Sequence, residues 1–248
     1  MRLDLYLAET ALVDSRTDAK RFILAGAVTV DGNIVTKPSF DVNGTEDISV
    51  DKSSKKYVSR GGLKLEAALD AFNIDPKDAY AIDIGASSGG FTDCLLQRGA
   101  AHVIAVDSGS GQMVDSLRND KRVTVIENFN ARYMSPNDFE YSPGLAVMDV
   151  SFISAKLLFP AVSNILQAGS DYICLIKPQF EVGKAGLNKK GIVKNEDLRK
   201  KAVEDVINSA KYCDFDLISK IESPIIGGDG NIEYLAHFKK RHSMERTY

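Results

Sequence analysis

The segment Ala81–Thr92, with the sequence AIDIGASSGGFT, gives the clearest indication of the fold. Its first four residues are apolar except for Asp83, as expected of a buried strand in a parallel sheet. Three glycines follow, and residues from about 90 to 98 have helical spacing. A glycine-rich loop between a strand and a helix lets a ligand approach the backbone N–H groups at the helix N-terminus. The stretch therefore predicts an α/β fold with a ligand site at this loop.

The spacing of the glycines narrows the class of ligand. The loop reads G-x-x-x-G-G, which is neither the GxGxxG of dinucleotide-binding enzymes nor a Walker loop with its Gly-Lys-Ser/Thr. Asp107 ends the next predicted strand, and an acid there can accept hydrogen bonds from both ribose hydroxyls of an adenosine. Dinucleotides and S-adenosylmethionine share this geometry, so the loop alone predicts an adenosine ligand and leaves its kind open.

Around this stretch, short apolar runs alternate with segments of helical periodicity, which is typical of a parallel sheet covered by helices. A Gly-rich turn at residues 227–230 lies between the last two apolar runs, which we expect to form an antiparallel terminal hairpin. The predicted fold is thus a Rossmann-like, mostly parallel α/β sheet. The expected strands are 79–84, 102–107, 122–127, 144–149, 171–177, 213–221 and 232–239, and the expected helices are 62–72, 90–98, 111–118, 155–167 and 195–211.

Residues 1–50 have a different pattern and predict a small α+β unit. Ser15 is a candidate N-cap for a helix that Gly26 should end. Residues 27–35 read as two strands around a Gly-containing turn, and residues 48–50 as a third strand. A polar, basic linker follows at residues 51–60. We therefore expect two domains, residues 1–58 with the linker and residues 59–248.

Composition excludes several classes of protein. The 248 residues carry a formal net charge of -3, so no overall basic field indicates a nucleic-acid partner. The three cysteines are far apart and form no CxxC pair, so we expect no metal and reduced thiols in a cytoplasmic protein. No apolar run approaches the roughly 20 residues of a membrane span, and the N-terminus lacks the apolar core of a signal peptide.

Four charged residues stand out near the carboxyl edge of the predicted sheet. Asp149 and Lys177 each end an apolar strand, Lys64 opens the helix before the first strand, and Glu233 lies in the last strand. Each alone has an ordinary explanation, such as a surface ion pair or a helix cap. Open α/β sheets bind their ligands at this edge, and four charges gathered there predict a catalytic site.

Several motifs resemble the TlyA family of ribosomal-RNA 2′-O-methyltransferases, which have an FtsJ-like catalytic domain and are often labelled haemolysins. In the N-terminal part, Arg2-Leu3-Asp4, Ser15-Arg16, residues 26–32 and Lys37-Pro38 are similar to an S4-like RNA-binding domain. The motifs of the catalytic part are Ser59–Leu65, Asp83–Thr92, Val147–Ile153, Ile176–Glu181, Ser223–Gly227 and Gly230–Glu233.

The resemblance implies the reaction and its residues. It implies S-adenosylmethionine-dependent methylation of a cytidine ribose in ribosomal RNA, of the small subunit and as a further option the large one, with Lys64, Asp149, Lys177 and Glu233 as the catalytic tetrad. The family varies at the residues before Asn130, which affects the contacts to the adenine. The expected cofactor-binding residues are Asp83, Gly85, Ala86, Ser87, Ser88, Gly89, Gly90, Phe91, Asp107, Phe129, Asn130 and Asp149. The expected RNA-binding residues are Arg2, Arg16, Lys20, Arg21, Lys37, Lys55, Lys56 and Arg60.

The chemistry gives Lys177 a role. A ribose 2′-hydroxyl must lose its proton as it attacks a methyl group, and a neutral lysine can accept that proton. Partial burial and a second cation, for which Lys64 is the candidate, would favour the neutral amine. Asp149 and Glu233 would then hold the amines and the ribose in position.

Three other functions compete with this interpretation. A nicotinamide-dependent oxidoreductase is disfavoured by the loop spacing and by the lack of a suitably placed Tyr-x-x-x-Lys pair. A non-catalytic ribosome-binding or assembly factor would not need the intact tetrad. A pore-forming haemolysin is disfavoured because the sequence shows neither an export signal nor a membrane-length segment.

Overall fold

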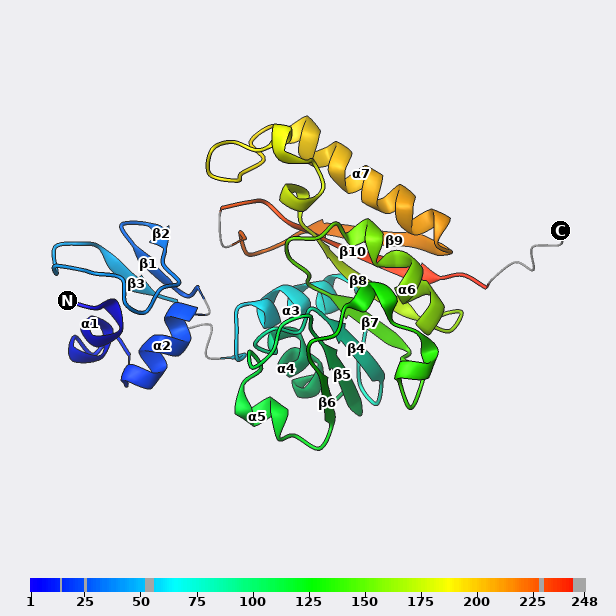
Figure 1. The fold of residues 1–248 in the computed structure, drawn as a ribbon, viewed down its shortest axis with the longest axis horizontal. Helices are drawn as coiled ribbons and strands as arrows, with labels where there is room; N and C mark the ends of the chain where they lie inside the picture. The colour runs from blue at the N-terminus through cyan, green and yellow to red at the C-terminus, as the bar shows by residue number, and fades with distance from the viewer. Residues whose placement is uncertain (14, 25, 52–55, 228–229, 243–248) are drawn as a thin grey trace.

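The structure is a computed structural model that describes residues 1–13, 15–24, 26–51, 56–227 and 230–242. Its larger part is one mixed sheet with helices on both faces (Figure 1). The strand order is β6-β5-β4-β7-β8-β10-β9, in which β10 is antiparallel to β8 and β9 and the other pairs are parallel. The predicted fold class is confirmed. The strands are β4 Tyr80–Ile84, β5 His102–Val106, β6 Val123–Ile126, β7 Leu145–Met148, β8 Asp171–Ile176, β9 Phe215–Glu222 and β10 Tyr234–Lys240.

Alternation along the strands places side chains on the two faces of the sheet. Ile82 and Ile84 of β4 belong to a core that α6 (Phe159–Ile165) and α7 (Glu196–Tyr212) cover. Ala81 belongs to the opposite core, beneath α3 (Gly61–Phe72) and α4 (Gly90–Gln97). The strands β4, β5, β7 and β8 are therefore buried on both faces, as their near-continuous apolar sequences predicted, whereas the edge strand β9 is largely exposed.

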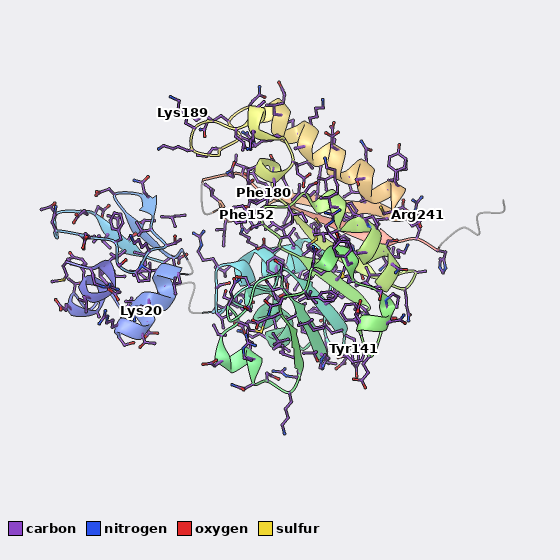
Figure 2. The ribbon with its side chains drawn as sticks, viewed as in Figure 1. Lys20, Tyr141, Phe152, Phe180, Lys189 and Arg241 are labelled. Carbon is purple, nitrogen blue, oxygen red and sulfur yellow. The ribbon has the colours of Figure 1, made fainter. Side chains whose placement is uncertain are left out.

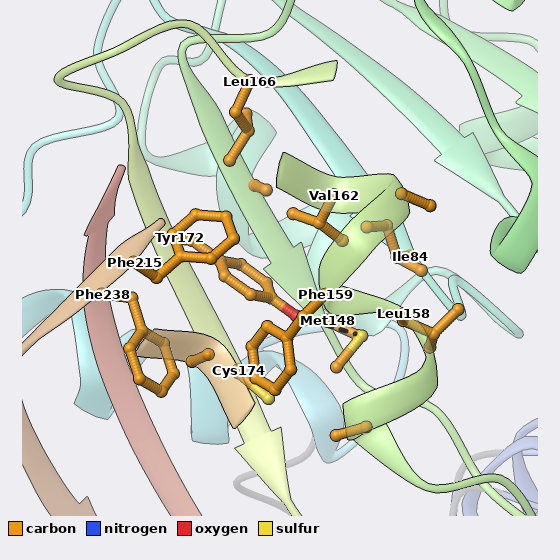
Figure 3. Packing of buried hydrophobic residues seen from close by; sticks show 14 of the residues in the cluster. Ile84, Met148, Leu158, Phe159, Val162, Leu166, Tyr172, Cys174, Phe215 and Phe238 are labelled. Atoms are coloured by element: carbon orange, nitrogen blue, oxygen red, sulfur yellow. Dashed lines mark hydrogen bonds between the residues drawn. The ribbon is translucent and has the colours of Figure 1, made fainter. Parts of the chain in front are cut away.

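Aromatic rings fill the first of these cores (Figure 3). Phe159 meets Tyr172 and Phe238 edge-on, with ring centroids 5.7 Å apart in both pairs. Phe215 of β9 packs against the same group, and the Tyr172 hydroxyl donates to the Met148 sulfur at 3.2 Å. This cluster fixes the terminal hairpin onto the parallel strands, which matters because the segment that enters β10 carries Glu233.

The N-terminal part consists of α1 (Leu3–Glu9), α2 (Arg16–Leu24) and a small antiparallel sheet. Its strands are β1 (Val28–Val30), β2 (Asn33–Ile34) and β3 (Ile48–Val50), in the order β2-β1-β3. The backbone N–H of Asp18 donates to the Ser15 hydroxyl at 3.0 Å, so Ser15 caps α2 as predicted. Gly26 follows the helix with φ +66, which favours glycine.

Two predicted helices and the position of one predicted site residue differ from the structure. Of the helix expected at 111–118, only α5 (Asp115–Arg118) forms. The helix expected at 155–167 divides into a 3₁₀ turn, Ala155–Leu157, and α6, whose first turn contains Pro160. Glu233 lies just before the last strand and not within it.

Candidate active site

The carboxyl edge of the large sheet gathers the predicted charges. Asp149 follows β7, and its backbone N–H donates to the carbonyl of Ile84 at 3.0 Å, which brings it beside the glycine-rich loop. Lys177 follows β8. Because β10 is antiparallel and Tyr234 pairs with Ile176, Glu233 reaches the same edge from the opposite chain direction.

The four charges form two ion pairs. Lys64, in the first turn of α3, places its Nζ 2.6 Å from Oε2 of Glu233, and the two side chains are 10% and 3% exposed. The Nζ of Lys177 lies 2.5 Å from Oδ1 of Asp149. Each amine thus contacts a carboxylate. The hypothesis that Lys64 acts as a second cation toward Lys177 stays a prediction.

Two uncharged side chains complete these pairs. Lys177 also donates to Oγ of Ser151 at 2.8 Å, and Nε2 of Gln179 donates to Oε1 of Glu233 at 3.3 Å. Both lie within motifs recognised in the sequence, but neither was assigned a role. Their position in the sequence could have indicated such a role, because each stands two residues after a predicted catalytic residue, just past the end of a strand.

A cavity of about 480 Å³ opens between the loop after β4 and the ends of β5 and β7. Asp107 lies in its wall, where its two carboxylate oxygens accept the backbone N–H groups of Ser87 at 2.8 Å and Gly109 at 2.7 Å. Six expected cofactor residues are among its lining: Gly85, Ser87, Asp107, Phe129, Asn130 and Asp149. The lining also includes Ile84, Val106, Ser108, Gln112, Ser151 and Phe152.

A smaller cavity of about 250 Å³ adjoins the first. Lys64, Asp149 and Lys177 all line it, together with Arg60 and with Leu24 of α2. Asp149 and Ser151 lie in the walls of both cavities. A molecule in the larger cavity and a molecule in the smaller one would therefore meet at Asp149, beside the Lys177 amine. The smaller cavity is also lined by the expected cofactor residues Gly85, Ala86, Ser87, Ser88, Gly90 and Phe91.

Two expected cofactor residues line neither cavity. Asp83 is fully buried, and its Oδ2 accepts the Thr92 hydroxyl at 2.7 Å. Burial raises the pKa of Asp83 to about 7, and its Oδ1 has no hydrogen-bond partner within the described residues. Gly89 has φ +96 and forms the turn into α4. Asp83 thus lies in the core and Gly89 within the loop itself, and their contact with the cofactor stays a prediction.

Gly90, which lines the smaller cavity, is also required for close packing. A Cβ on Gly90 would lie 2.1 Å from Oγ of Ser59, and one on Gly62 would lie 2.3 Å from the Tyr57 ring. These glycines let the beginnings of α3 and α4 approach each other closely. Lys64 lies two residues after Gly62, in the same first turn of α3, and lines the smaller cavity.

Phe152 is a feature that the sequence reasoning missed. Its side chain is 92% exposed, and its φ of +64 is unusual for a bulky residue. The ring lies 5.3 Å from that of Phe180, and both rings are on the side of the domain that faces the N-terminal part (Figure 2). Such exposure of an aromatic ring at a cavity wall indicates a contact surface.

Several of the expected RNA-binding residues already form ion pairs or are partly buried. Arg2 and Arg16 both contact the buried Asp4, at 2.9 and 3.1 Å, and lower the pKa of that carboxyl to about 2. Lys56 pairs with Glu66. Burial lowers the pKa of Arg60.

The other expected RNA-binding residues have simpler surroundings. Lys20 and Lys37 are exposed, and Arg21 lies in α2. Lys55 lies outside the described residues. Exposed lysines of the N-terminal part therefore remain candidates for phosphate contacts.

Comparison with known proteins identifies the family. Residues 57–240 match the FtsJ-like methyltransferase family and residues 1–48 match the S4 domain. The chain is 44% identical to "Hemolysin A" of Brachyspira hyodysenteriae, over 96% of this chain and 99% of that protein. It is 42% identical to the 16S/23S rRNA (cytidine-2'-O)-methyltransferase TlyA of Mycobacterium tuberculosis, over 94% of this chain and 87% of that protein. The chain belongs to the TlyA family.

Solved structures agree with this membership. A hemolysin candidate from Streptococcus thermophilus is 43% identical to this chain. Its structure superposes with a TM-score of 0.78 over 98% of this chain and 89% of that one. The N-methyltransferase NodS of Bradyrhizobium japonicum shares the fold at 12% identity, with a TM-score of 0.54 over 77% of this chain and 99% of that one.

The methyl donor of this methyltransferase is S-adenosylmethionine, and the site fits it. The larger cavity is of the size that small-molecule pockets have. Its wall combines apolar side chains with the Asp107 carboxylate, whose oxygens retain lone pairs beyond the two backbone N–H groups they accept. That carboxylate is suited to ribose hydroxyls, as the sequence predicted.

Proposed function

We propose that this protein transfers a methyl group from S-adenosylmethionine to the 2′-hydroxyl of a cytidine in ribosomal RNA of the small subunit, and that the large subunit is a second substrate to be tested. The observation that carries the proposal is the position of Asp149, which lines both cavities and contacts Lys177. The names of the TlyA relatives from Mycobacterium tuberculosis and Campylobacter jejuni support the cytidine and the ribosomal RNA. Such a substrate places the reaction in the cytoplasm.

In this proposal the larger cavity holds the cofactor and the smaller one admits the ribose. When bound, S-adenosylmethionine supplies an electrophilic methyl group on a positively charged sulfur. Asp107 accepts the hydroxyls of the adenosine ribose, and Phe129 and Asn130 contact the adenine. The loop residues 85–88 line the cavity at the boundary with the acceptor site.

Lys177 is the proposed proton acceptor. The bond from the methyl carbon to the sulfonium sulfur would break as the 2′-oxygen bonds to that carbon, and the hydroxyl proton would pass to Nζ of Lys177. Lys177 must first release a proton from its ion pair with Asp149; Asp149 and Ser151 orient the nitrogen through contacts of 2.5 and 2.8 Å. Glu233 would hold Lys64, which lines the acceptor site, and Gln179 would hold Glu233. Holding the reactants in line supplies much of the rate.

The same site can select RNA. The exposed ring of Phe152 offers a stacking surface for the base of the target nucleotide, since every base has a π-face. A hydroxyl at the 2′ position is required for the reaction and distinguishes RNA from DNA. Exposed lysines of the N-terminal part, such as Lys20 and Lys37, would contact phosphates.

Methyl transfer to purified ribosomal subunits tests the proposal. Subunits from cells that lack this protein are incubated with it and labelled S-adenosylmethionine, and the 2′-O-methyl positions are mapped. We expect stoichiometric label at a cytidine ribose and none with Lys177→Ala. Label on a base, or no label above that of Lys177→Ala, would contradict the proposal.

A non-catalytic assembly role would predict the second outcome together with intact subunit binding. Among the described residues, no helix has the length and apolar character to cross a bilayer.

A further inference from the structure

The segment 182–194 between the Lys177 motif and α7 is unusually basic. It contains Lys184, Lys189, Lys190 and Lys194 and no acidic residue, on a protein whose net charge is -3. All four lysines are exposed. In the described part of the chain none of them forms an ion pair, whereas Lys200 in α7 pairs with Glu196 at 2.8 Å. We call this segment the lysine loop.

The tip of the lysine loop has a defined shape. Oδ1 of Asn188 accepts the backbone N–H groups of Lys190 at 2.8 Å and Ile192 at 2.9 Å, and the Asn188 N–H donates to the Ile192 carbonyl at 3.0 Å. Gly191 closes this turn with φ +75. The tip is thus held by its own hydrogen bonds, and Lys189 projects away from the domain at its outer edge (Figure 2).

One buried side chain joins the lysine loop to the catalytic segment. Asn231 is 1% exposed; its Oδ1 accepts the Val193 N–H at 3.0 Å and its Nδ2 donates to the Gly191 carbonyl at 3.0 Å. Asn231 stands two residues before Glu233, which pairs with Lys64. Asn231 therefore ties the loop by hydrogen bonds to the backbone segment that carries Glu233 two residues later.

We propose that the lysine loop binds phosphates of the ribosomal RNA next to the target ribose, and that Asn231 positions the loop relative to Glu233. The inference rests on the proposed function and extends it with an RNA-binding surface on the methyltransferase part, where the sequence had placed the RNA contacts in the first 60 residues. The loop begins five residues after Lys177 and lies on the same side of the domain as Phe152 and Phe180 (Figure 2). An RNA strand with its ribose at Lys177 would bring its neighbouring phosphates within reach of these amines.

Electrostatics favour phosphates as the ligand. An exposed run of lysines is ordinarily only a solvated surface, but here the run has no acidic partner and its backbone is fixed, so little order is lost on binding. Each phosphate neutralised by a lysine releases a counterion, which lowers the slope of log affinity against log salt by about 0.7 to 0.9. The loop therefore predicts a measurable part of the salt dependence of binding.

The test compares two double variants of the full-length protein with the same change in charge. Lys189→Gln/Lys190→Gln removes the two tip amines, and Lys201→Gln/Lys211→Gln removes two exposed amines of α7. Binding to deproteinised ribosomal RNA is measured at several salt concentrations, beside a thermal melt and a cofactor titration. We expect the tip variant alone to lose about 1 to 2 in salt slope, with cofactor affinity unchanged.

Steady-state methyl transfer adds a second readout. The tip variant should raise KM for the RNA on the order of 10-fold with kcat within about twofold, because the loop contacts phosphates and not the reacting atoms. The inference would be overturned if the α7 variant lost as much salt slope as the tip variant, so that the two double variants had equal slopes. Binding is measured independently of catalysis. A wild type that binds without methylating would therefore refute the proposed function and leave the loop to be judged by its slope.

Asn231→Ala tests the positioning role. If Asn231 holds the loop, adding Lys189→Gln/Lys190→Gln to Asn231→Ala should change the salt slope less than it does in the wild type, since coupled residues are not additive. Full additivity would show that the loop binds without Asn231. Should Asn231→Ala fail to fold, the two lysine variants still decide whether the loop binds RNA.

Discussion

Lys64 and Glu233 are 169 positions apart in the chain, yet Nζ of one lies 2.6 Å from Oε2 of the other. The pair joins the first turn of α3 to the segment that enters β10, and both side chains are almost fully buried. A buried ion pair is weak evidence for net stabilisation, but removal of one partner leaves an unpaired charge in a poorly solvated place. The pair therefore ties the folding of the C-terminal hairpin to the geometry of the acceptor site.

Removal of one partner should cost stability. We expect Lys64→Ala to lower the free energy of unfolding by about 3 to 5 kcal/mol, because the Glu233 carboxylate stays buried without its cation. The double variant Lys64→Met/Glu233→Leu should recover most of that loss, yet remain inactive. Urea unfolding measures both. A double variant as unstable as Lys64→Ala would mean that the α3 packing, and not the unpaired charge, sets the cost.

Lys177→Ala should abolish methyl transfer while the fold and cofactor binding stay nearly intact. The amine lies at the end of β8 and opens no large apolar cavity when removed. Lys177→Arg should fail as well, because a guanidinium stays protonated and cannot accept the proton. Single-turnover transfer to ribosomal subunits, with a melt and a cofactor titration of each variant, measures this. Near wild-type activity in Lys177→Arg would show that Lys177 is a charge or an anchor and not the base.

The sequence allowed the sheet, the two-part organisation and the edge that carries the charges to be predicted, because strand ends and glycine spacing are local signals. Which of these charges form ion pairs with each other was not predictable in the same way. Nothing local says that Lys64 meets Glu233 while Lys177 meets Asp149. The register of β8 and β10, which pairs Tyr234 with Ile176, brings Glu233 to the level of Lys177, yet its carboxylate pairs with Lys64 of α3. Asn231 is a similar case, because its partners lie some 40 residues earlier in the chain.

The exposure or burial of particular side chains was the other property that the sequence did not allow to be predicted. Phe152 reads as one more apolar residue after a strand, and only its left-handed backbone turns the ring outward. The family resemblance implies that Asp83 binds the cofactor, which stays a prediction, but the burial of its side chain was not visible in the sequence. The alternation of β4 points its side chain into the core, toward Thr92.

The buried Asp83 should make stability depend on pH. Burial raises its pKa in the folded protein to about 7, above the ordinary value of 3.8 for an aspartate. Between these two pH values the folded state therefore holds a proton that the unfolded state has released. The unfolded state binds fewer protons there, and the free energy of unfolding therefore falls as pH rises from about 4 to 7, then levels off. The total effect is on the order of 4 kcal/mol for three pKa units.

Asp83→Asn provides the matched control, since it keeps the shape without the titration. Urea unfolding should show that the free energy of unfolding falls more between pH 5 and pH 8 in the wild type than in the variant. Parallel losses in the two proteins would mean that other groups carry the pH dependence.

The domain boundary predicted at residue 58 can be sharpened from one contact. Tyr57 is 4% exposed and packs with Leu65 and Cys94 in the core beneath α3 and α4. A shortened protein that begins at Lys56 should therefore fold and bind the cofactor, whereas one that begins at Val58 should melt at a lower temperature. Both should bind ribosomal RNA more weakly than the full chain. Equal RNA affinity and salt slope for the shortened and full proteins would show that the N-terminal part is not an RNA anchor.

Phe152 offers a prediction that separates recognition of the RNA from the chemistry. Its ring is 92% exposed beside Phe180, and stacking of a base on an aromatic side chain is worth about 1 to 3 kcal/mol. We expect Phe152→Ala to weaken use of the RNA by one to two orders of magnitude in kcat/KM. Phe152→Tyr keeps the flat ring and should retain most activity, whereas Phe152→Leu keeps apolar bulk and should not. Because Phe152 also lines the larger cavity, cofactor affinity is measured in each variant and should change by less than about twofold. If Phe152→Leu proves as active as Phe152→Tyr, the side chain acts through its volume, and the target base is held elsewhere.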